Sequence, residues 1–396
     1  MPVTHPFTFE DTEVAFASKS DRELKKMYWL FAAMNSNFLV RFGTQGVILA
    51  LKMKLPIKKL IKSTVFGHFC GGETIQECKQ TISELGASGI GTILDYSAEG
   101  EKTEAGFEAN KEEILQTVMN AATSAHIPFA VMKVSGLGSE ELMTKSQDGK
   151  QLNGKEQKAF DNIHRRVEEL CSKSHELNVR IFIDAEDYAY QGVIDGLALE
   201  MMRKYNKERA IVYTTLQFYR WDAYDKLVGL HEKGKTEGFY LGVKLVRGAY
   251  MENERERAEE MGYKDPIQPT KQATDIDYNR ALDFCAANHK RIAFCSGSHN
   301  EQSNALLTSL MQQYGIAKDD QGVFFAQLYG MSDNISFKLS KEGYNVAKYV
   351  PYGPLEKVMP YLIRRAEENT SVAGQTGREF NFIKKELDRR SGLKSA

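Results

Sequence analysis

Short apolar, β-rich runs alternate with longer amphipathic segments along most of this chain, and this alternation limits the possible folds more than any other feature. Eight candidate strands follow one another from Val65 onward: 65–70, 90–95, 129–134, 179–184, 210–216, 240–246, 291–296 and 322–328. Strands joined by helix-length segments run parallel, and eight of them can close into a (βα)8 TIM-type barrel without edges. The pattern alone leaves a doubly wound open sheet as a second solution.

One candidate strand ends in a polar turn. Residues Phe239–Glu254 read FYLGVKLVRGAYMENE, and this segment places Lys244, Arg247 and Tyr250 near the carboxyl end of the strand. Gly248 has no side chain to keep the backbone away from a ligand or to forbid positive φ. Because ligands bind at the carboxyl ends of parallel strands, this stretch is predicted to line a pocket. A plain strand followed by a basic turn is the alternative.

The composition excludes several classes of function. Hydrophobic residues make up 42% of the 396 residues, charged residues 27%, and the formal net charge is -1, which is ordinary for a globular protein and gives no electrostatic basis for binding nucleic acid. The five cysteines show no CxxC or Cys/His spacing, so we expect reduced, buried thiols and no metal site. The glycines of Gly86–Gly91 lack the GxGxxG spacing of a Rossmann site.

The first residues suggest where the protein is located. Met1–Glu10 lacks the build of a secretory signal, and no apolar run approaches the roughly 18 residues of a membrane span, so a cytoplasmic location is predicted. Residues 1–62 are expected to form a helical N-terminal arm, with 63–396 as the barrel and its C-terminal helices. The Lys-rich part of the arm, 50–62, either lies on a membrane surface or packs on its own domain. Residues 138–158 are predicted to form an inserted loop.

Seven motifs occur in the order found in one enzyme family. They are HFCGGET, ILDYSAE, MKVSGL, FIDAED, SHN, FAQLYGM and KYVPYGPLEKVMPYLIRRAEEN, and they accompany the segment Lys244–Leu282. Over about residues 8–390 the chain resembles the proline dehydrogenases, in particular the monofunctional, eukaryote-like branch. These FAD enzymes oxidise L-proline to Δ1-pyrroline-5-carboxylate. The resemblance implies a barrel with the flavin over its C-terminal mouth and the last helix above that mouth.

The substrate side of the predicted site depends largely on one helix. Tyr361, Arg364, Arg365 and Glu368 are spaced i, i+3, i+4 and i+7 and therefore share a face. Paired arginines suit an amino-acid carboxylate, because the guanidinium fork binds it with two hydrogen bonds. The resemblance assigns substrate binding and catalysis to Lys133, Asp184, Tyr349, Tyr361, Arg364 and Arg365, with Glu73 as a gate acid that pairs with Arg364.

The resemblance also implies a set of flavin contacts: Gln217, Lys244, Val246, Arg247, Gly248, Tyr250, Thr274, Ser298, His299, Asn300, Gln327 and Glu368. The chain departs from many family members at Lys244, where they have arginine; lysine keeps the charge but loses the planar fork. Gln327 follows the eukaryote-like branch. Thr270 lies one turn before Thr274 and is an alternative to it.

The predicted reaction is hydride transfer from the ring carbon next to the proline nitrogen to flavin N5, and the family then passes the electrons to a quinone. The chain is too short to include an aldehyde dehydrogenase domain, so a separate enzyme is expected to take the product. The alternatives are a 4-hydroxyproline dehydrogenase, which tends to have a small residue in place of Tyr349, and a non-catalytic binding barrel. A binding barrel would have lost some of Lys133, Asp184, Arg364 and Arg365, and all four are present.

Overall fold

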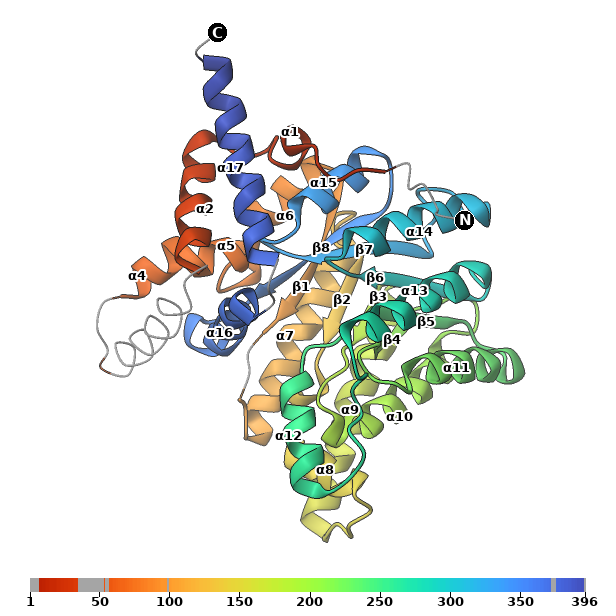
Figure 1. Ribbon diagram of the computed structural model, residues 1–396. Helices are drawn as coiled ribbons and strands as arrows, with labels where there is room; N and C mark the ends of the chain where they lie inside the picture. The colour runs from red at the N-terminus through yellow and green to blue at the C-terminus, as the bar shows by residue number, and fades with distance from the viewer. Residues whose placement is uncertain (1–6, 35–52, 54–56, 98–99, 372–374, 395–396) are drawn as a thin grey trace.

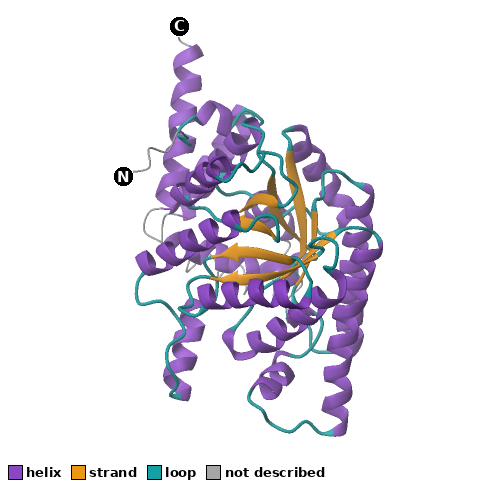
Figure 2. Ribbon diagram, turned by 90° about the vertical axis from the view of Figure 1, so that its right-hand side faces the viewer, coloured by secondary structure: helices purple, strands orange, loops and turns teal. Residues whose placement is uncertain are grey.

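Eight parallel strands form a closed barrel in the computed structural model, which describes residues 7–34, 53, 57–97, 100–371 and 375–394. The strands are β1 Ile90–Tyr96, β2 Phe129–Met132, β3 Arg180–Ile183, β4 Val212–Gln217, β5 Leu241–Val246, β6 Ile292–Gly297, β7 Val323–Leu328 and β8 Val346–Tyr352. They pair in chain order, and β8 closes the barrel against β1. Figure 2 shows the strands at the centre with helices around them. The closed sheet confirms the barrel and excludes the doubly wound alternative.

Helices follow the strands and cover the outside of the barrel (Figure 1). They are α7 Glu104–Thr123, α8 Glu140–Gln147, α9 Gly154–Glu176, α10 Tyr188–Tyr205, α11 Ala223–Glu237, α12 Met251–Met261, α13 Lys271–Ala287, α14 Glu301–Gln313, α15 Asp333–Lys341, α16 Leu355–Ser371 and α17 Gln375–Lys394. Local capping interactions define where these helices begin and end. Asn153 and Glu156 form a capping box at the start of α9, and Gly238, at φ +71°, ends α11 in the left-handed conformation.

One predicted strand is wrong, and one observed strand was not predicted. The run 65–70 is helical: a π-helical turn, Lys62–Phe66, leads directly into α5, Gly67–Phe69. Apolar runs this short do not distinguish a strand from a buried helical segment, and here Phe66 and Phe69 are buried against the N-terminal helices. The eighth strand is Val346–Tyr352 instead, which contains Pro351. Proline usually argues against a strand, and this one lies near the carboxyl end of β8.

The predicted loop 138–158 is also partly wrong. Residues Glu140–Gln147 form α8, whose start is capped by the Ser139 side chain accepting a hydrogen bond from the Leu142 amide. The helix is stable despite its polar sequence because Leu142 and Met143 are buried.

Helices precede the barrel in the described part of the chain. They are α1 Thr12–Ala15, α2 Asp21–Met34, α4 Lys58–Ile61 and, just before β1, α6 Ile75–Ala87. The apolar face of α2 packs with Phe382 and Ile383 of α17, and Figure 1 shows the two helices side by side. The part of the arm at 35–52 and 54–56 lies outside the described residues, and the domain division at residue 62 stays a prediction. No described helix combines the length and apolarity that crossing a membrane requires.

Aromatic side chains fill the barrel interior. Phe129 stacks on Phe182 with ring centroids 4.3 Å apart, and the rings of Tyr213 and Phe324 meet Phe129 edge-on. All five cysteines are buried and free. A packed interior of this kind leaves the ends of the barrel for ligands.

We expect Phe129→Ala to destabilise the protein by about 3–5 kcal/mol, because it leaves a cavity inside the barrel. Chemical unfolding followed by circular dichroism measures the change. Met119→Ala, at an exposed position on α7, is the control and should shift the free energy of unfolding by less than about 0.5 kcal/mol. Equal midpoints for both variants would contradict a packed interior.

Candidate active site

A buried carboxylate joins three strands at the carboxyl end of the barrel. Asp184 directly follows β3; Lys244 of β5 donates a hydrogen bond to its Oδ1, and the hydroxyl of Tyr349 of β8 donates to its Oδ2. The Lys244 ammonium also lies 4.7 Å from the centroid of the Tyr349 ring and 5.0 Å from that of Phe182. Burial, with the charge of Asp184, raises the pKa of Tyr349 well above its ordinary value, so the phenol stays protonated and keeps donating.

A second carboxylate, which sequence reasoning missed, holds Lys133. The Lys133 ammonium lies 2.7 Å and 2.6 Å from the two carboxylate oxygens of Asp95 in β1, and the Ser97 hydroxyl donates to Asp95 at 2.7 Å. Asp95 is buried and Lys133 is half-buried. Asp95 stands within the ILDYSAE motif near the end of its strand, so the strand-end argument applied to Asp184 would have found it.

Arg247, just after β5, makes a network of polar contacts. Its Nε lies 2.7 Å from Asp275 of α13, and its two terminal nitrogens donate to the hydroxyls of Ser298 (2.7 Å) and Ser303 (2.9 Å). Its guanidinium carbon lies 4.3 Å from the centroid of the Tyr278 ring. Asp275, Ser303 and Tyr278 carry no sequence signal that connects them with Arg247. The network fixes the direction of the arginine.

The turn after β5 fits closely against the end of β4. The amide of Ala249 donates to Gln217 Oε1 at 3.3 Å, and Gln217 Nε2 donates to the Glu186 carbonyl at 2.9 Å. Gly248 has φ +135°, and a Cβ at this position would lie 1.5 Å from ring atoms of Tyr219. Glycine is therefore required here both for the backbone angle and for space. Val246 pairs with Gln217 across the sheet, and Tyr250 directly precedes α12.

The Ser298–His299–Asn300 turn joins β6 to α14. Asn300 caps α14 by accepting from the Ser303 amide at 2.9 Å, and His299 Nδ1 lies 2.8 Å from the Ser332 hydroxyl. Burial, with the nearby charges of Lys348, Arg365 and Arg247, lowers the pKa of His299 to about 3. The imidazole is therefore neutral at pH 7.

Gln327 and Thr274 are both buried close to protein partners. Gln327 Nε2 donates to the Ser298 carbonyl at 3.1 Å, and its Oε1 accepts from the Ser336 hydroxyl at 2.8 Å. Thr270 caps α13, whereas Thr274 is buried one turn later, which favours Thr274 of the two. Their contacts with a cofactor stay predictions.

Helix α16 carries the predicted carboxylate-binding face. Tyr361 is buried, Arg364 and Arg365 are half-buried, and the guanidinium carbon of Arg365 lies 5.4 Å from the centroid of the Tyr361 ring. Tyr361 packs in one apolar cluster with Met331 of the segment after β7. Because α16 follows β8 and Tyr361 packs with a residue after β7, α16 lies near the carboxyl end of the barrel. Glu368 belongs to α16, and its side chain lies outside the described residues.

Glu73 forms an ion pair with Lys62 and accepts a hydrogen bond from the Leu355 amide, 2.9 Å away, at the start of α16. The predicted gate pairing of Glu73 with Arg364 stays a prediction.

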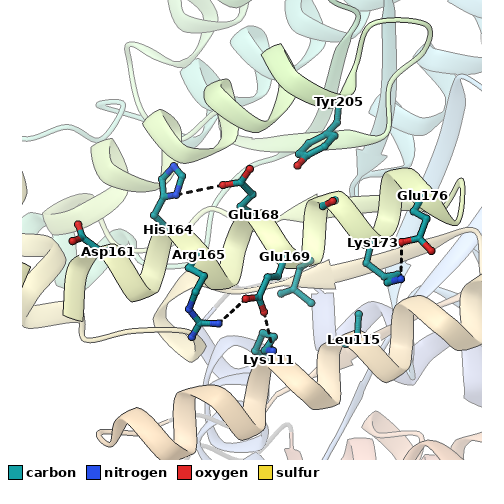
Figure 3. A pocket seen from close by; sticks show the side chains of 12 residues that line it. Lys111, Leu115, Asp161, His164, Arg165, Glu168, Glu169, Lys173, Glu176 and Tyr205 are labelled. Carbon is teal, nitrogen blue, oxygen red and sulfur yellow. Dashed lines mark hydrogen bonds and ion pairs between the residues drawn. The ribbon is translucent and has the colours of Figure 1, made fainter. Parts of the chain in front are cut away.

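A groove of about 510 Å³ lies elsewhere, on the outer surface beside α7, α9 and α10 (Figure 3). Charged side chains line it and pair with one another, for example Lys111 with Glu169 at 2.9 Å and Arg165 with Glu169 at 2.6 Å. None of the predicted site residues borders it. We therefore place the candidate site at the carboxyl end of the strands, where the buried, strand-end charges converge.

Comparison with known proteins shows the family of this chain. The family profile described as Proline dehydrogenase matches residues 78–378. The chain belongs to the proline dehydrogenase family. It is therefore a proline dehydrogenase family enzyme, as the motifs predicted. The matched region contains β1–β8, α16 and all the predicted site residues except Glu73.

Three curated relatives are 33–43% identical to this chain over the aligned regions. "Proline dehydrogenase 1, mitochondrial" of Dictyostelium discoideum is 33% identical over 96% of this chain and 74% of its own length. The human protein of the same name is 43% identical over 78% of this chain, which spans 48% of the human length. "Carbapenem antibiotics biosynthesis protein CarD" of Pectobacterium carotovorum is 36% identical over 83% of this chain and 85% of its own length.

Solved structures share the fold. Proline utilization A (PutA) from Bdellovibrio bacteriovorus, inactivated by N-propargylglycine, superposes with a TM-score of 0.73 at 20% identity. The superposition covers 93% of this chain and 39% of the PutA chain. This chain thus spans about two fifths of the PutA chain. At this level of identity the similarity shows a shared fold.

The neutral His299 should make stability depend on pH. Its folded-state pKa of about 3 lies below the unfolded value of about 6.5, so between these values the unfolded chain binds a proton that the folded chain does not, and stability falls as the pH is lowered. His299→Gln should reduce this loss by up to about 1.4 kcal/mol per pH unit. Urea unfolding between pH 6.5 and 5 measures it. The exposed His175 gives the control, His175→Gln, and equal slopes for wild type and His299→Gln would contradict a buried neutral imidazole.

Proposed function

We propose that this chain oxidises L-proline to Δ1-pyrroline-5-carboxylate with FAD as the hydride acceptor. The observation that carries the proposal is the convergence of Asp184, Lys244 and Tyr349 at the carboxyl end of the barrel. Membership of the proline dehydrogenase family supports the same reaction. The non-catalytic binding barrel is not favoured, because the charged residues of the site are present and most of them are held by protein partners.

The substrate carboxylate is assigned to Arg364, Arg365 and Lys133. The two arginines are half-buried on α16, and Lys133 is half-buried and fixed by Asp95. Partial burial strengthens charge-assisted hydrogen bonds, and three cations give a strong preference for an anionic group. Asp95 balances one of these charges, so Lys133 keeps its orientation without substrate. An amino acid with a free carboxylate is the substrate class that fits this set.

The rings of Tyr349 and Tyr361 are assigned to the walls around the methylene groups of proline. Both are buried, and the hydroxyl of Tyr349 is fixed on Asp184. An aromatic ring in a fixed position gives apolar contact to a saturated ring and excludes water. The proposed role of the protein is thus to orient the ring carbon next to the nitrogen, with little acid–base chemistry of its own.

The donors at the strand ends suit a dinucleotide with a polar ring edge and phosphates. Gln217 and Lys244 offer an amide and an ammonium near the substrate side, while Arg247, Ser298 and the start of α14 offer hydrogen-bond donors and a helix N-terminus at the β5–β6 side. Gly248 allows a close backbone approach. When bound, FAD would accept the hydride that proline loses. We assign no covalent link to it, since no cysteine or histidine stands in a recognisable attachment context.

Glu73 is proposed to close the site over the substrate by pairing with Arg364. Its contact with the Leu355 amide ties it to the start of the helix that carries this arginine.

A quinone is the proposed electron acceptor, and a separate dehydrogenase is the proposed consumer of the product. We place the protein in the cytoplasm or peripherally on a membrane; several relatives are named as mitochondrial. Of the basic arm residues, Lys58 and Lys62 pair with Glu356 and Glu73, while Lys52 and Lys54 lie outside the described residues.

Anaerobic addition of L-proline to the FAD-loaded protein should bleach the flavin absorbance, and Arg365→Met should raise the proline KM strongly while leaving the FAD content unchanged. The lost charge-assisted contacts correspond to about 2–4 kcal/mol. Arg378→Met, at an exposed position on α17, is the matched control. Absence of bleaching in wild type would reject the reaction, and an unchanged KM would remove Arg365 from the site.

We also expect a preference for L-proline over trans-4-hydroxy-L-proline. The Tyr349 ring is buried and fixed by Asp184, so an added ring hydroxyl would lose its hydrogen bonds to water at a cost of about 1–3 kcal/mol, roughly ten- to a hundredfold in kcat/KM. Tyr349→Ser should reduce the preference, mainly by lowering the efficiency with proline. Steady-state kinetics with both substrates measures this preference. Equal kcat/KM values for the two substrates in wild type would favour a 4-hydroxyproline dehydrogenase.

A further inference from the structure

A fully buried ion pair lies directly beside the turn after β5. Glu254 of α12 is 0% exposed and Arg220, which follows β4, is 4% exposed by side chain. Arg220 Nε donates to Glu254 Oε2 at 3.2 Å and its terminal nitrogen to Oε1, while the Tyr219 hydroxyl and the Tyr188 amide donate to Oε1 at 2.7 Å and 3.2 Å. Such a pair is rarely a net source of stability, because both charges have lost their water. We therefore looked for a role of this ion pair in holding neighbouring segments in position.

Helix α12 is anchored to the barrel by this carboxylate more than by apolar packing. Within Met251–Met261 the buried residues are Glu254 and Ala258, and the two terminal methionines are 44% and 58% exposed. Arg255 adds an outer contact, through a hydrogen bond to the Gln268 carbonyl at 3.2 Å. An exposed helix held chiefly by one buried acid will lose its position if that acid loses its partners.

Tyr219 connects this anchor to the turn Arg247–Tyr250. Its hydroxyl donates to Glu254, its ring fills the space where a Cβ on Gly248 would lie, and its amide donates to the Arg247 carbonyl at 2.7 Å. Arg220 also donates to the Glu186 carbonyl at 3.2 Å, the same oxygen that Gln217 contacts. The anchor and the residues assigned to the cofactor therefore share one set of hydrogen bonds.

We propose that Glu254 is a positioning residue: with Arg220 and Tyr219 it holds the start of α12 and so sets the conformation of the turn Arg247–Tyr250 that faces the cofactor. Glu254 is not one of the residues assigned to the substrate or the cofactor. The inference rests on the proposed function, since the cofactor it concerns is the proposed FAD. It assigns to a residue outside the predicted site a part in cofactor affinity.

Glu254→Gln tests the proposal, because glutamine keeps the size and one acceptor but loses the charge. At saturating FAD the proline KM should stay within about twofold, since the carboxylate site lies on α16, while the FAD dissociation constant rises about tenfold or more. In the protein stripped of FAD, trypsin should cut after Arg255 and Arg257 faster than in wild type. An unchanged FAD dissociation constant with unchanged cleavage would overturn the proposal.

Glu386→Gln is the matched control. Glu386 of α17 is equally buried and also holds arginines, with Arg389 Nε at 2.8 Å and Arg390 Nε at 2.7 Å. It should lower the melting temperature comparably without changing FAD affinity or cleavage in α12. A rise in the FAD dissociation constant as large as that of Glu254→Gln would show a general effect of destabilisation and reject a positioning role.

Two further variants keep the test decisive if Glu254→Gln does not fold. Tyr219→Phe removes a single hydroxyl and should give a smaller rise in the FAD dissociation constant with a near-normal melting temperature. Arg220→Met/Glu254→Met should restore stability, because apolar pairs can replace buried ion pairs, but should leave FAD affinity low. Full recovery of FAD affinity in the double variant would reject the proposal. If wild type itself binds no FAD, the proposed function fails, while trypsin cleavage of the FAD-free protein still tests the anchor.

Discussion

The burial of the Asp184 carboxylate is the constraint on which the site depends. A carboxylate removed from water is stable only with a charge or donors beside it. Lys244 and Tyr349 supply both, and they come from β5 and β8, two strands that the closed barrel brings to the same end as β3. If the barrel did not close in this order, the three groups would not meet. The geometry of the site therefore depends on the closure of the barrel.

Two further cations of the site, Lys133 and Arg247, are also held by polar partners within the protein. Asp95 fixes Lys133, and Asp275 with two serines fixes Arg247. Such preorganisation reduces the entropy lost on binding and keeps side chains in a productive direction. Lys133 and Arg247 are held by carboxylates on different elements, Asp95 of β1 and Asp275 of α13.

The sequence predicted most of the barrel and a set of candidate site residues, but not the contacts between them. Seven of the observed strands were predicted, because each is an apolar run between helix-length segments. β8 was missed since Pro351 lies in it, and 65–70 was assigned as a strand because a short apolar run has no period. Asp184 and Lys244 stood out at strand ends. Asp275 and Glu254 did not, since their partners lie far away in the sequence and only the folded chain brings them together.

The kinetics of a single turnover test the central claim most directly. The rate constant for anaerobic reduction of the bound flavin by L-proline would be measured in wild type, Asp184→Asn, Tyr349→Phe and the double variant. Since the phenol acts through its bond to Asp184, the double variant should be no slower than Asp184→Asn by more than about twofold, a strong departure from additivity. Losses that multiply in the double variant would show that the two residues act independently and would contradict the account.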